Sequence, residues 1–285
     1  MTSVLVAIVV VAGLAGAVWI ALRVRRQLER ANNDVLTTVK DAVNGVFMRA
    51  EARGAIRRVT GFWTDYDDDY PELRRLEASY EAVRDECLEL LREKDRITDI
   101  SVLGGDYTGG GIHAIRWKSF VFKSGDFIEA NCRLAPRTAE LLRDIPGVYT
   151  AFFSILDPHQ YVTPHYGYYK GILRYHLGVI IPGDNADRSA WLRVNSSPEA
   201  NEIRQKSLID KGERYHWRNG EGVIFDDFHL HDAANDSDEV RVVLWLDIAR
   251  KMPARLRLFD AIVMGIAHRL PVISKIQENA RIESV

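Results

Sequence analysis

The sequence predicts a mainly β fold, a sandwich or barrel, with flanking helices and an N-terminal transmembrane helix. Three observations support this prediction. Apolar or alternating runs recur at short spacing in the second half of the chain, separated by turn clusters such as "PGDNADRS" and "NDSDE". The stretches on either side instead repeat their apolar residues at helical spacing. The chain also begins with one long run of uncharged, apolar residues.

The composition is that of a folded protein and excludes one class of partner. The chain has 285 residues, 47% hydrophobic and 27% charged, which suits one large domain or two small ones. A formal net charge of −2 gives no support for a polyanion, so nucleic acid is not an expected partner. Cys87 and Cys132 match no metal or redox spacing and form no disulfide framework, which fits a reducing compartment.

The N-terminal run "VLVAIVVVAGLAGAVWIAL" (4–22) is apolar enough for a membrane span, which needs about 20 such residues. Arg23, Arg25 and Arg26 follow it. By the positive-inside rule, everything after residue 23 then lies in the cytoplasm. No charged side chain precedes Val4, as one would in a cleaved signal peptide. We therefore expect residues 1–23 to be a single-pass signal anchor in a bacterial inner membrane.

Helical patterns flank the predicted β domain, which we expect to span residues 101–252. Residues 24–100 are expected to form a juxtamembrane helical region, whose arginines meet either anionic lipid headgroups or solvent. Pro71 opens the clearest helix there, to about residue 95. Residues 253–285 are expected to form an amphipathic helical tail that either lies on a membrane or covers the barrel.

The β domain itself is expected to hold short strands and one helix near 136–143. The expected strands are 112–122, 148–156, 172–181, 190–194, 222–227 and 240–248. The glycine-rich stretch "GGDYTGGG" leads into the first of them. A phosphate-binding loop would lead into a helix, so we interpret this stretch as a plain loop.

One strand carries two polar side chains on a single face. In residues 173–181, alternation places Arg174 and His176 on one side and the apolar residues on the other. Two such groups facing inward would need an anion or other partners. An outward polar face fits the pattern as well, so the strand alone leaves both interpretations open.

Residues 222–247 bring together residue types that bind metals and anions. Asp226 and Asp227 end an apolar strand, and His229 and His231 follow directly, which makes a metal site plausible. Arg241 comes next, in an apolar strand where a buried cation needs a partner. Asp226 or Asp227 could provide it. Alternatively, Arg241 could clamp a carboxylate ligand.

A further histidine, His165, lies in the turn "PHYG". A His-x-Asp or His-x-Glu pair there would suggest the facial triad of non-haem iron enzymes, two histidines and one carboxylate. The residue two positions after His165 is Gly167, so this carboxylate is missing.

Two long stretches resemble the aspartyl/asparaginyl β-hydroxylase family. They are "FSILDPHQYVTPHYGYYKGILRYHLGVIIP" (153–182) and "WRNGEGVIFDDFHLHDAANDSDEVRVVLWLDI" (217–248), within a match over roughly residues 115–250. The resemblance implies a double-stranded β-helix (jelly-roll) core and a dioxygenase that uses Fe(II), 2-oxoglutarate and O₂. The family includes membrane-bound bacterial lipid A 2-hydroxylases. At the position where the carboxylate is missing, Gly167 here, members of the family also have glycine.

The resemblance also implies roles for particular residues. His165 and His231 would be the iron ligands, while His229 falls at a position that the family does not use. Arg174 and His176 would face inward, toward the 1-carboxylate of 2-oxoglutarate. Arg241 would grip the 5-carboxylate, assisted by Ser154. The chain departs from the usual pattern at residues 168–171 and at Phe228.

We therefore expect a membrane-anchored hydroxylase with a cytoplasmic catalytic domain. A lipid or acyl chain is the favoured substrate, and an aspartyl or asparaginyl side chain of a peptide or small molecule is the alternative. A barrel that binds a metal or carboxylate without turnover is a third interpretation, because a fold does not establish an activity. A zinc hydrolase usually has three protein ligands, and only two are evident here.

Overall fold

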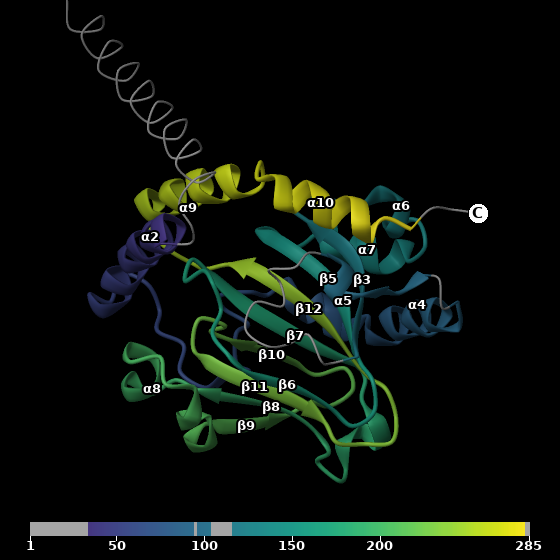
Figure 1. Ribbon diagram of the computed structural model, residues 1–285. Helices are drawn as coiled ribbons and strands as arrows, with labels where there is room; N and C mark the ends of the chain where they lie inside the picture. The colour runs from purple at the N-terminus through teal and green to yellow at the C-terminus, as the bar shows by residue number, and fades with distance from the viewer. Residues whose placement is uncertain (1–33, 94–95, 104–115, 283–285) are drawn as a thin grey trace, which may run out of the picture. The chain divides into compact units, whose positions relative to one another are not determined.

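The computed structural model describes residues 34–93, 96–103 and 116–282, and Figure 1 shows their arrangement. The chain divides into two compact units, residues 1–49 and 50–285, and the second contains the β domain. The predicted anchor, residues 1–23, lies outside the described residues. No helix within the described ranges has the length and apolar character needed to cross a bilayer.

The described chain begins and ends with helices, and all of its strands lie between them. The helices are α2 (Asp34–Ala52), α3 (Leu73–Ala78), α4 (Tyr80–Arg92), α5 (Ile100–Leu103), α6 (Glu129–Cys132), α7 (Pro136–Arg143), α8 (Pro198–Glu202), α9 (Ala254–Ala267) and α10 (Pro271–Ala280), with 3-10 turns η3 (Pro182–Asn185) and η4 (Lys206–Lys211). The strands are β1 (Phe62–Trp63), β2 (Thr98–Asp99), β3 (Trp117–Ser124), β4 (Asp126–Phe127), β5 (Val148–Leu156), β6 (Gln160–His165), β7 (Ile172–Ile180), β8 (Ala190–Asn195), β9 (Glu213–His216), β10 (Gly222–Phe225), β11 (Leu230–Asn235) and β12 (Arg241–Ala249).

The strands form two antiparallel sheets. The larger has the order β1-β10-β7-β12-β5-β3-β2, with β4 paired to β3, and the smaller has the order β6-β11-β8-β9. From β5 to β12 the chain crosses from one sheet to the other after every strand except β8, which is followed by its neighbour β9, so most neighbours in the two sheets are not consecutive in the chain. This is a jelly-roll arrangement, and it confirms the prediction of a mainly β core with flanking helices.

Each strand of the larger sheet presents its two faces to different surroundings. Leu173, Tyr175 and Leu177 of β7 pack on the outer side, in a core shared with α3, α4 and α7. The inner side of the sheet meets the smaller sheet in a second core, which includes Val243 and Trp245 of β12. Because side chains alternate along a strand, Arg174 and His176 must then point between the sheets. The inward orientation is therefore the one adopted.

Several predicted elements differ from the observed ones. Strands β6, β9 and β11 are absent from the prediction, because each is short and mixes polar with apolar residues. The helix expected from Pro71 to about residue 95 is split into α3 and α4 around Ser79. The predicted tail helix is likewise two helices, α9 and α10, because Pro271 begins the second one.

Candidate active site

A cavity between the two sheets brings together all six predicted site residues. Its walls include Ser154, Arg174, His176 and Arg241 from the larger sheet, and His165 and His231 from the smaller one. Trp117, Trp217, Phe225 and Trp245 form much of the remaining wall. Polar groups converging in a largely aromatic cavity are typical of a small-molecule site.

His165 and His231 form a cross-strand pair. They are register partners in β6 and β11, and their ring centroids are 4.1 Å apart. His165 Nδ1 lies 2.7 Å from the carbonyl oxygen of Thr163, and His231 Nδ1 lies 2.8 Å from that of His229. A carbonyl can only accept a hydrogen bond, so each Nδ1 carries the proton. Each Nε2 is therefore left with a lone pair, the state in which imidazole binds a metal.

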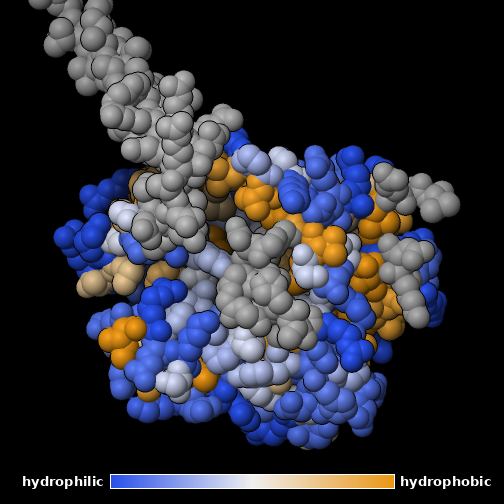
Figure 2. Space-filling model, in the orientation of Figure 1, coloured by the Kyte–Doolittle hydropathy of each residue, from blue (hydrophilic) through white to orange (hydrophobic). Residues whose placement is uncertain are grey.

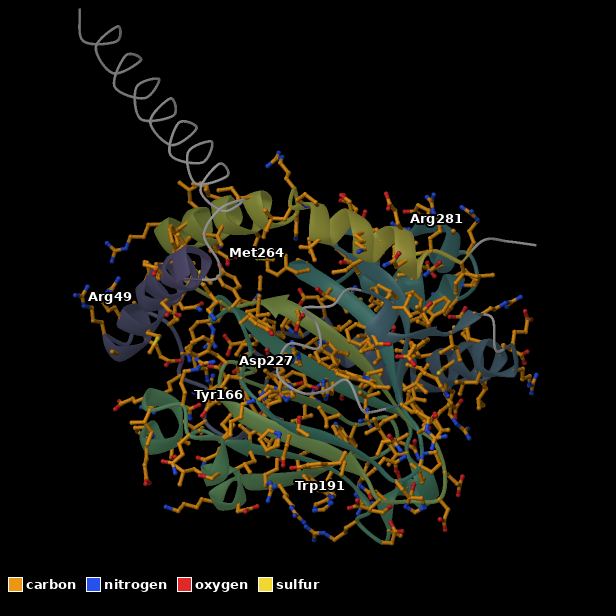
Figure 3. All side chains as sticks on the ribbon, viewed as in Figure 1. Arg49, Tyr166, Trp191, Asp227, Met264 and Arg281 are labelled. Atoms are coloured by element: carbon orange, nitrogen blue, oxygen red, sulfur yellow. The ribbon has the colours of Figure 1, made fainter. Side chains whose placement is uncertain are left out.

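Asp227 lies beside this pair, and Figure 3 shows it between the two sheets. Its Oδ1 is 3.1 Å from His231 Nε2, and the same carboxylate forms an ion pair with Arg174. Burial raises the pKa of Asp227, but Arg174 and His231 outweigh burial and hold it well below the usual range. A carboxylate this close to an imidazole lone pair needs a positive charge between them, either a proton or a metal cation.

Asp227 also explains why residue 167 is glycine. The Gly167 N–H donates to the Asp227 carbonyl oxygen at 2.8 Å. A Cβ at Gly167 would lie 2.0 Å from Asp227 Oδ2. The space that a facial-triad side chain would need is thus filled by a carboxylate from the loop before β11. Among the described residues, no three His, Cys, Asp or Glu side chains are spaced to hold a metal ion together.

The other end of the cavity carries a buried cation, Arg241, that no carboxylate of the described residues pairs with. Arg241 is 3% exposed and lies over the Trp217 ring, 4.7 Å from its centroid. Burial lowers its pKa to about 9. Its NH1 group donates to the Ser154 carbonyl oxygen at 3.4 Å, and within the described part of the chain Nε finds no acceptor. Such a buried charge is costly unless an anion neutralises it.

His176 and Trp217 add further unsatisfied nitrogens near Arg241. Both ring nitrogens of His176, and Nε1 of Trp217, have no hydrogen-bond partner among the described residues. Burial, reinforced by Arg174 and Arg241, keeps the pKa of His176 well below its usual range, so the ring is neutral. The Ser154 hydroxyl accepts from Trp117 Nε1 at 2.9 Å and retains its own proton for another acceptor. These groups are complementary to an anion with several acceptor oxygens.

The structure corrects the proposed pairing of Arg241 with Asp226 or Asp227. Asp226 is fully buried and binds Lys170 at 2.5 Å and Arg250 at 2.6 Å. Asp227 is engaged by Arg174. Both carboxylates therefore already have cationic partners, and neither reaches Arg241.

Arg174 has more partners than the sequence indicates. Besides Asp227, it donates to Asp247 Oδ1 at 2.9 Å and stacks on Trp245, 3.8 Å from the ring centroid. Asp247 is a residue that the sequence analysis missed. Its signal was present, because alternation along β12 puts it on the same face as Arg241.

His229 lies outside the cavity wall, although it is buried. Burial lowers its pKa to about 4, and its carbonyl oxygen accepts the hydrogen bond from His231. Its part in the site is therefore through the backbone. The roles assigned to the six cavity residues remain predictions, and the structure adds that they converge on one place.

Comparison with known proteins identifies the class to which this fold and site belong. The family model described as aspartyl/asparaginyl beta-hydroxylase matches residues 77–251, more than half of the chain. The chain therefore belongs to the aspartyl/asparaginyl β-hydroxylase family, a family of hydroxylases.

The individual proteins compared with this chain are each less than one third identical to it. The chain is 32% identical over 216 residues to an ornithine lipid ester-linked acyl 2-hydroxylase of Rhizobium tropici, covering 75% of this chain and 66% of the relative. It is 27% identical to the human aspartyl/asparaginyl beta-hydroxylase, covering 66% of this chain but 22% of that protein. A prolyl hydroxylase structure from Trichoplax adhaerens overlaps with a TM-score of 0.41 at 8% identity, covering 77% and 94% of the two chains. An overlap of that size carries no weight here.

Proposed function

We propose that this protein is an Fe(II)- and 2-oxoglutarate-dependent hydroxylase of a membrane lipid acyl chain. The observation that carries the proposal is that two kinds of group line the same cavity. Two imidazole Nε2 lone pairs lie at one side, and at the other lies a buried arginine that has no carboxylate partner among the residues described. Iron(II) and the dianion 2-oxoglutarate match these two requirements.

Bound there, iron(II) and 2-oxoglutarate would supply with O₂ the oxidising power to hydroxylate an unactivated C–H bond, with succinate and CO₂ as co-products. His165 and His231 would hold the metal, and their backbone hydrogen bonds would fix both rings. Asp227, held by Arg174, would keep a negative charge at the position left open by Gly167.

The cosubstrate would be bound by the remaining cavity residues. The Arg241 guanidinium and the Ser154 hydroxyl would receive the distal carboxylate, and the bidentate geometry of arginine suits this role. His176, being neutral, would donate one N–H toward the other carboxylate. The surrounding tryptophans would exclude water and strengthen these charge interactions.

Two relatives support different substrates. The relative that is 32% identical is named for an acyl group of ornithine lipid, and this supports a lipid substrate. The apolar run 4–22 supports the same choice, since an anchor in the inner membrane would keep a cytoplasmic catalytic domain near lipid. The human relative supports the alternative, an aspartyl or asparaginyl side chain.

The test uses the full chain reconstituted with Fe(II), ascorbate, 2-oxoglutarate and bacterial lipid extract. We expect succinate to form together with a lipid that has gained one oxygen atom in its acyl chain. His165→Ala should abolish both products. His159→Ala is the matched control, because His159 lies at the surface and pairs with Asp238 there.

Other outcomes would reject parts of the proposal. Full succinate production by His165→Ala would refute the metal site. Hydroxylation of an aspartyl- or asparaginyl-containing peptide in a parallel incubation, with the lipid unchanged, would favour the aspartyl or asparaginyl substrate. Binding of 2-oxoglutarate without succinate, with either substrate, would favour a binding barrel without turnover.

A further inference from the structure

Helix α9 presents an apolar face that no described residue covers. Leu258, Ile262 and Ile266 recur every four residues and therefore lie on one side of the helix. Their exposures are 65%, 54% and 60%, and Leu270 and Val272 extend the exposed apolar surface onto the start of α10. Five of the eleven exposed large hydrophobic residues described thus fall within residues 258–272. Figure 2 shows hydrophobic surface along the edge where Figure 1 places α9 and α10.

The opposite side of α9 is fixed to the β domain by a buried carboxylate. Asp260 accepts hydrogen bonds from the Tyr149 hydroxyl and the Tyr169 hydroxyl, each at 2.6 Å. It is 4% exposed, and burial, strengthened by Asp260, raises the pKa of both tyrosines. Because Asp260 points inward, the apolar face must point outward, and the helix cannot roll to bury it without breaking both bonds.

A basic rim surrounds this apolar face. Residues 251–275 contain five Lys or Arg, and their one acidic residue is the buried Asp260. The rim consists of the exposed side chains Lys251, Arg255, Arg257, Arg269 and Lys275. None of the five has an ion-pair partner in the described ranges. An apolar stripe edged by cations is the pattern of a helix that lies in the headgroup region of an anionic membrane.

We propose that α9 and the start of α10 form a docking surface for an anionic lipid bilayer. Leu258, Ile262, Ile266 and Leu270 enter the headgroup–acyl boundary, and the basic rim contacts the phosphates. A second copy of the chain fits less well, because a symmetric contact through this face would place the two basic rims against each other. The charge of the rim thus favours an anionic surface over another α9.

Docking would bring the membrane close to the candidate active site. Tyr169, which holds Asp260, follows His165 by four residues. Four extended residues span at most about 14 Å, so α9 is fixed near the end of β6 that carries His165. The docking surface deepens the proposed function, since it would hold the catalytic cavity beside a lipid substrate, but its test does not depend on turnover.

The test measures membrane depth at Ile262 in the full chain. A nitroxide label is attached to Ile262→Cys, and Glu81→Cys on the exposed side of α4 is the matched control. Cys87 and Cys132 are buried, and burial raises the pKa of both thiols, so the label goes to the introduced cysteine. The protein is reconstituted in vesicles of phosphatidylcholine with phosphatidylglycerol.

We expect the Ile262 label to collide more often with dissolved oxygen than with a water-soluble nickel complex, and the Glu81 label to show the reverse. Changing Arg255, Arg257, Arg269 and Lys275 to Gln should reduce the ratio of docked to undocked label at least tenfold. Docking without any lipid hydroxylation would leave this proposal standing and refute the lipid substrate.

Three outcomes would overturn the docking surface. The first is equal accessibility of the Ile262 and Glu81 labels to the nickel complex in vesicles. The second is dipolar broadening between Ile262 labels in detergent, which would mean that a second copy covers the face. The third is low accessibility to both quenchers in detergent and vesicles alike, which would mean that the chain covers its own face.

Discussion

Arg241 shows how one side chain can define a ligand. It is buried, it lies over an aromatic ring, and its Nε lacks an acceptor among the described residues. A structural arginine in such a place would have a carboxylate partner, as Arg174 and Arg250 do here. An anion bound beside Arg241 would offset the energetic cost of burying it.

We expect Arg241→Lys to weaken 2-oxoglutarate binding at least tenfold, which is about 1.4 kcal/mol. Lysine keeps the charge but loses the fixed fork of donors that suits a carboxylate. Anaerobic calorimetry on the metal-loaded protein measures the affinity, with Arg218→Lys as a surface control. Metal affinity should stay unchanged, and an unaltered cosubstrate affinity would contradict the role of Arg241.

Gly167 is required for a steric reason. Any Cβ there would meet the Asp227 carboxylate and its carbonyl oxygen, the latter at 2.6 Å. We expect Gly167→Ala to lower the free energy of unfolding by roughly 1–3 kcal/mol, as overpacking does. Denaturant titration measures the change. The control is Gly265→Ala in α9, where only the Arg269 side chain lies within 4 Å and alanine favours the helix. Equal effects at the two positions would contradict this account.

At the scale of elements, alternation along the strands decides which side chains reach the site. On β7, β12 and β5, every second side chain faces the helices, and the side chains between them face the cavity. The two sheets then bring His165 and His231 opposite the larger sheet, so each sheet supplies part of the candidate site.

The buried carboxylate of Asp260 helps to attach helix α9 to the β domain. We expect Asp260→Ala to cost about 1.5–3 kcal/mol for each lost bond to the charged acceptor and to loosen α9 selectively. Hydrogen exchange should become faster in residues 254–267, while protection in β12 is unchanged. Arg257→Gln, on the exposed side of the same helix, should leave exchange as it is. A uniform increase across the β domain would show instead that Asp260 supports the whole fold.

At the scale of the whole molecule, buried histidines make stability depend on pH. Burial lowers the pKa of His165 to about 3 and that of His229 to about 4, against about 6.5 in an unfolded chain. As the pH falls below about 6.5, the unfolded state takes up protons that the folded state does not. The free energy of unfolding is therefore complete above that pH and decreases on acidification until the folded pKa values are reached.

We expect metal-free protein to lose up to about 1.4 kcal/mol per pH unit for each such histidine between pH 6.5 and 4.5. This window lies above the carboxylate pKa values, so Asp226 and Asp227 contribute little to the slope. His229→Gln should reduce the slope measured by denaturant titration at several pH values. His159→Gln, at the surface, should not, and identical slopes for the wild type and His229→Gln would rule out this explanation.

The sequence by itself determined the alternation of side chains along the predicted strands and the chemistry available on their faces. It placed Arg174 with His176 on one face, and the resemblance carried by two long stretches indicated the family. Asp247 was within its reach by the same alternation. The helix start at Pro271 was also readable from the sequence, because proline favours the first position of a helix. The break at Ser79 and the short strands β6, β9 and β11 were not predictable, because their local patterns are weak.

Only the tertiary structure decided which face of each strand points inward and which charges meet. Periodicity separates two opposite faces, but the packing of the smaller sheet decides which of them lines the cavity. Ion pairing likewise joins residues far apart in sequence, such as Arg174 with Asp227 and Asp247, or Asp226 with Lys170 and Arg250. Within the described part of the chain, packing therefore brings no carboxylate to Arg241 and places that of Asp227 where Gly167 has no side chain, because a buried charge is neutralised by whichever partner lies within reach.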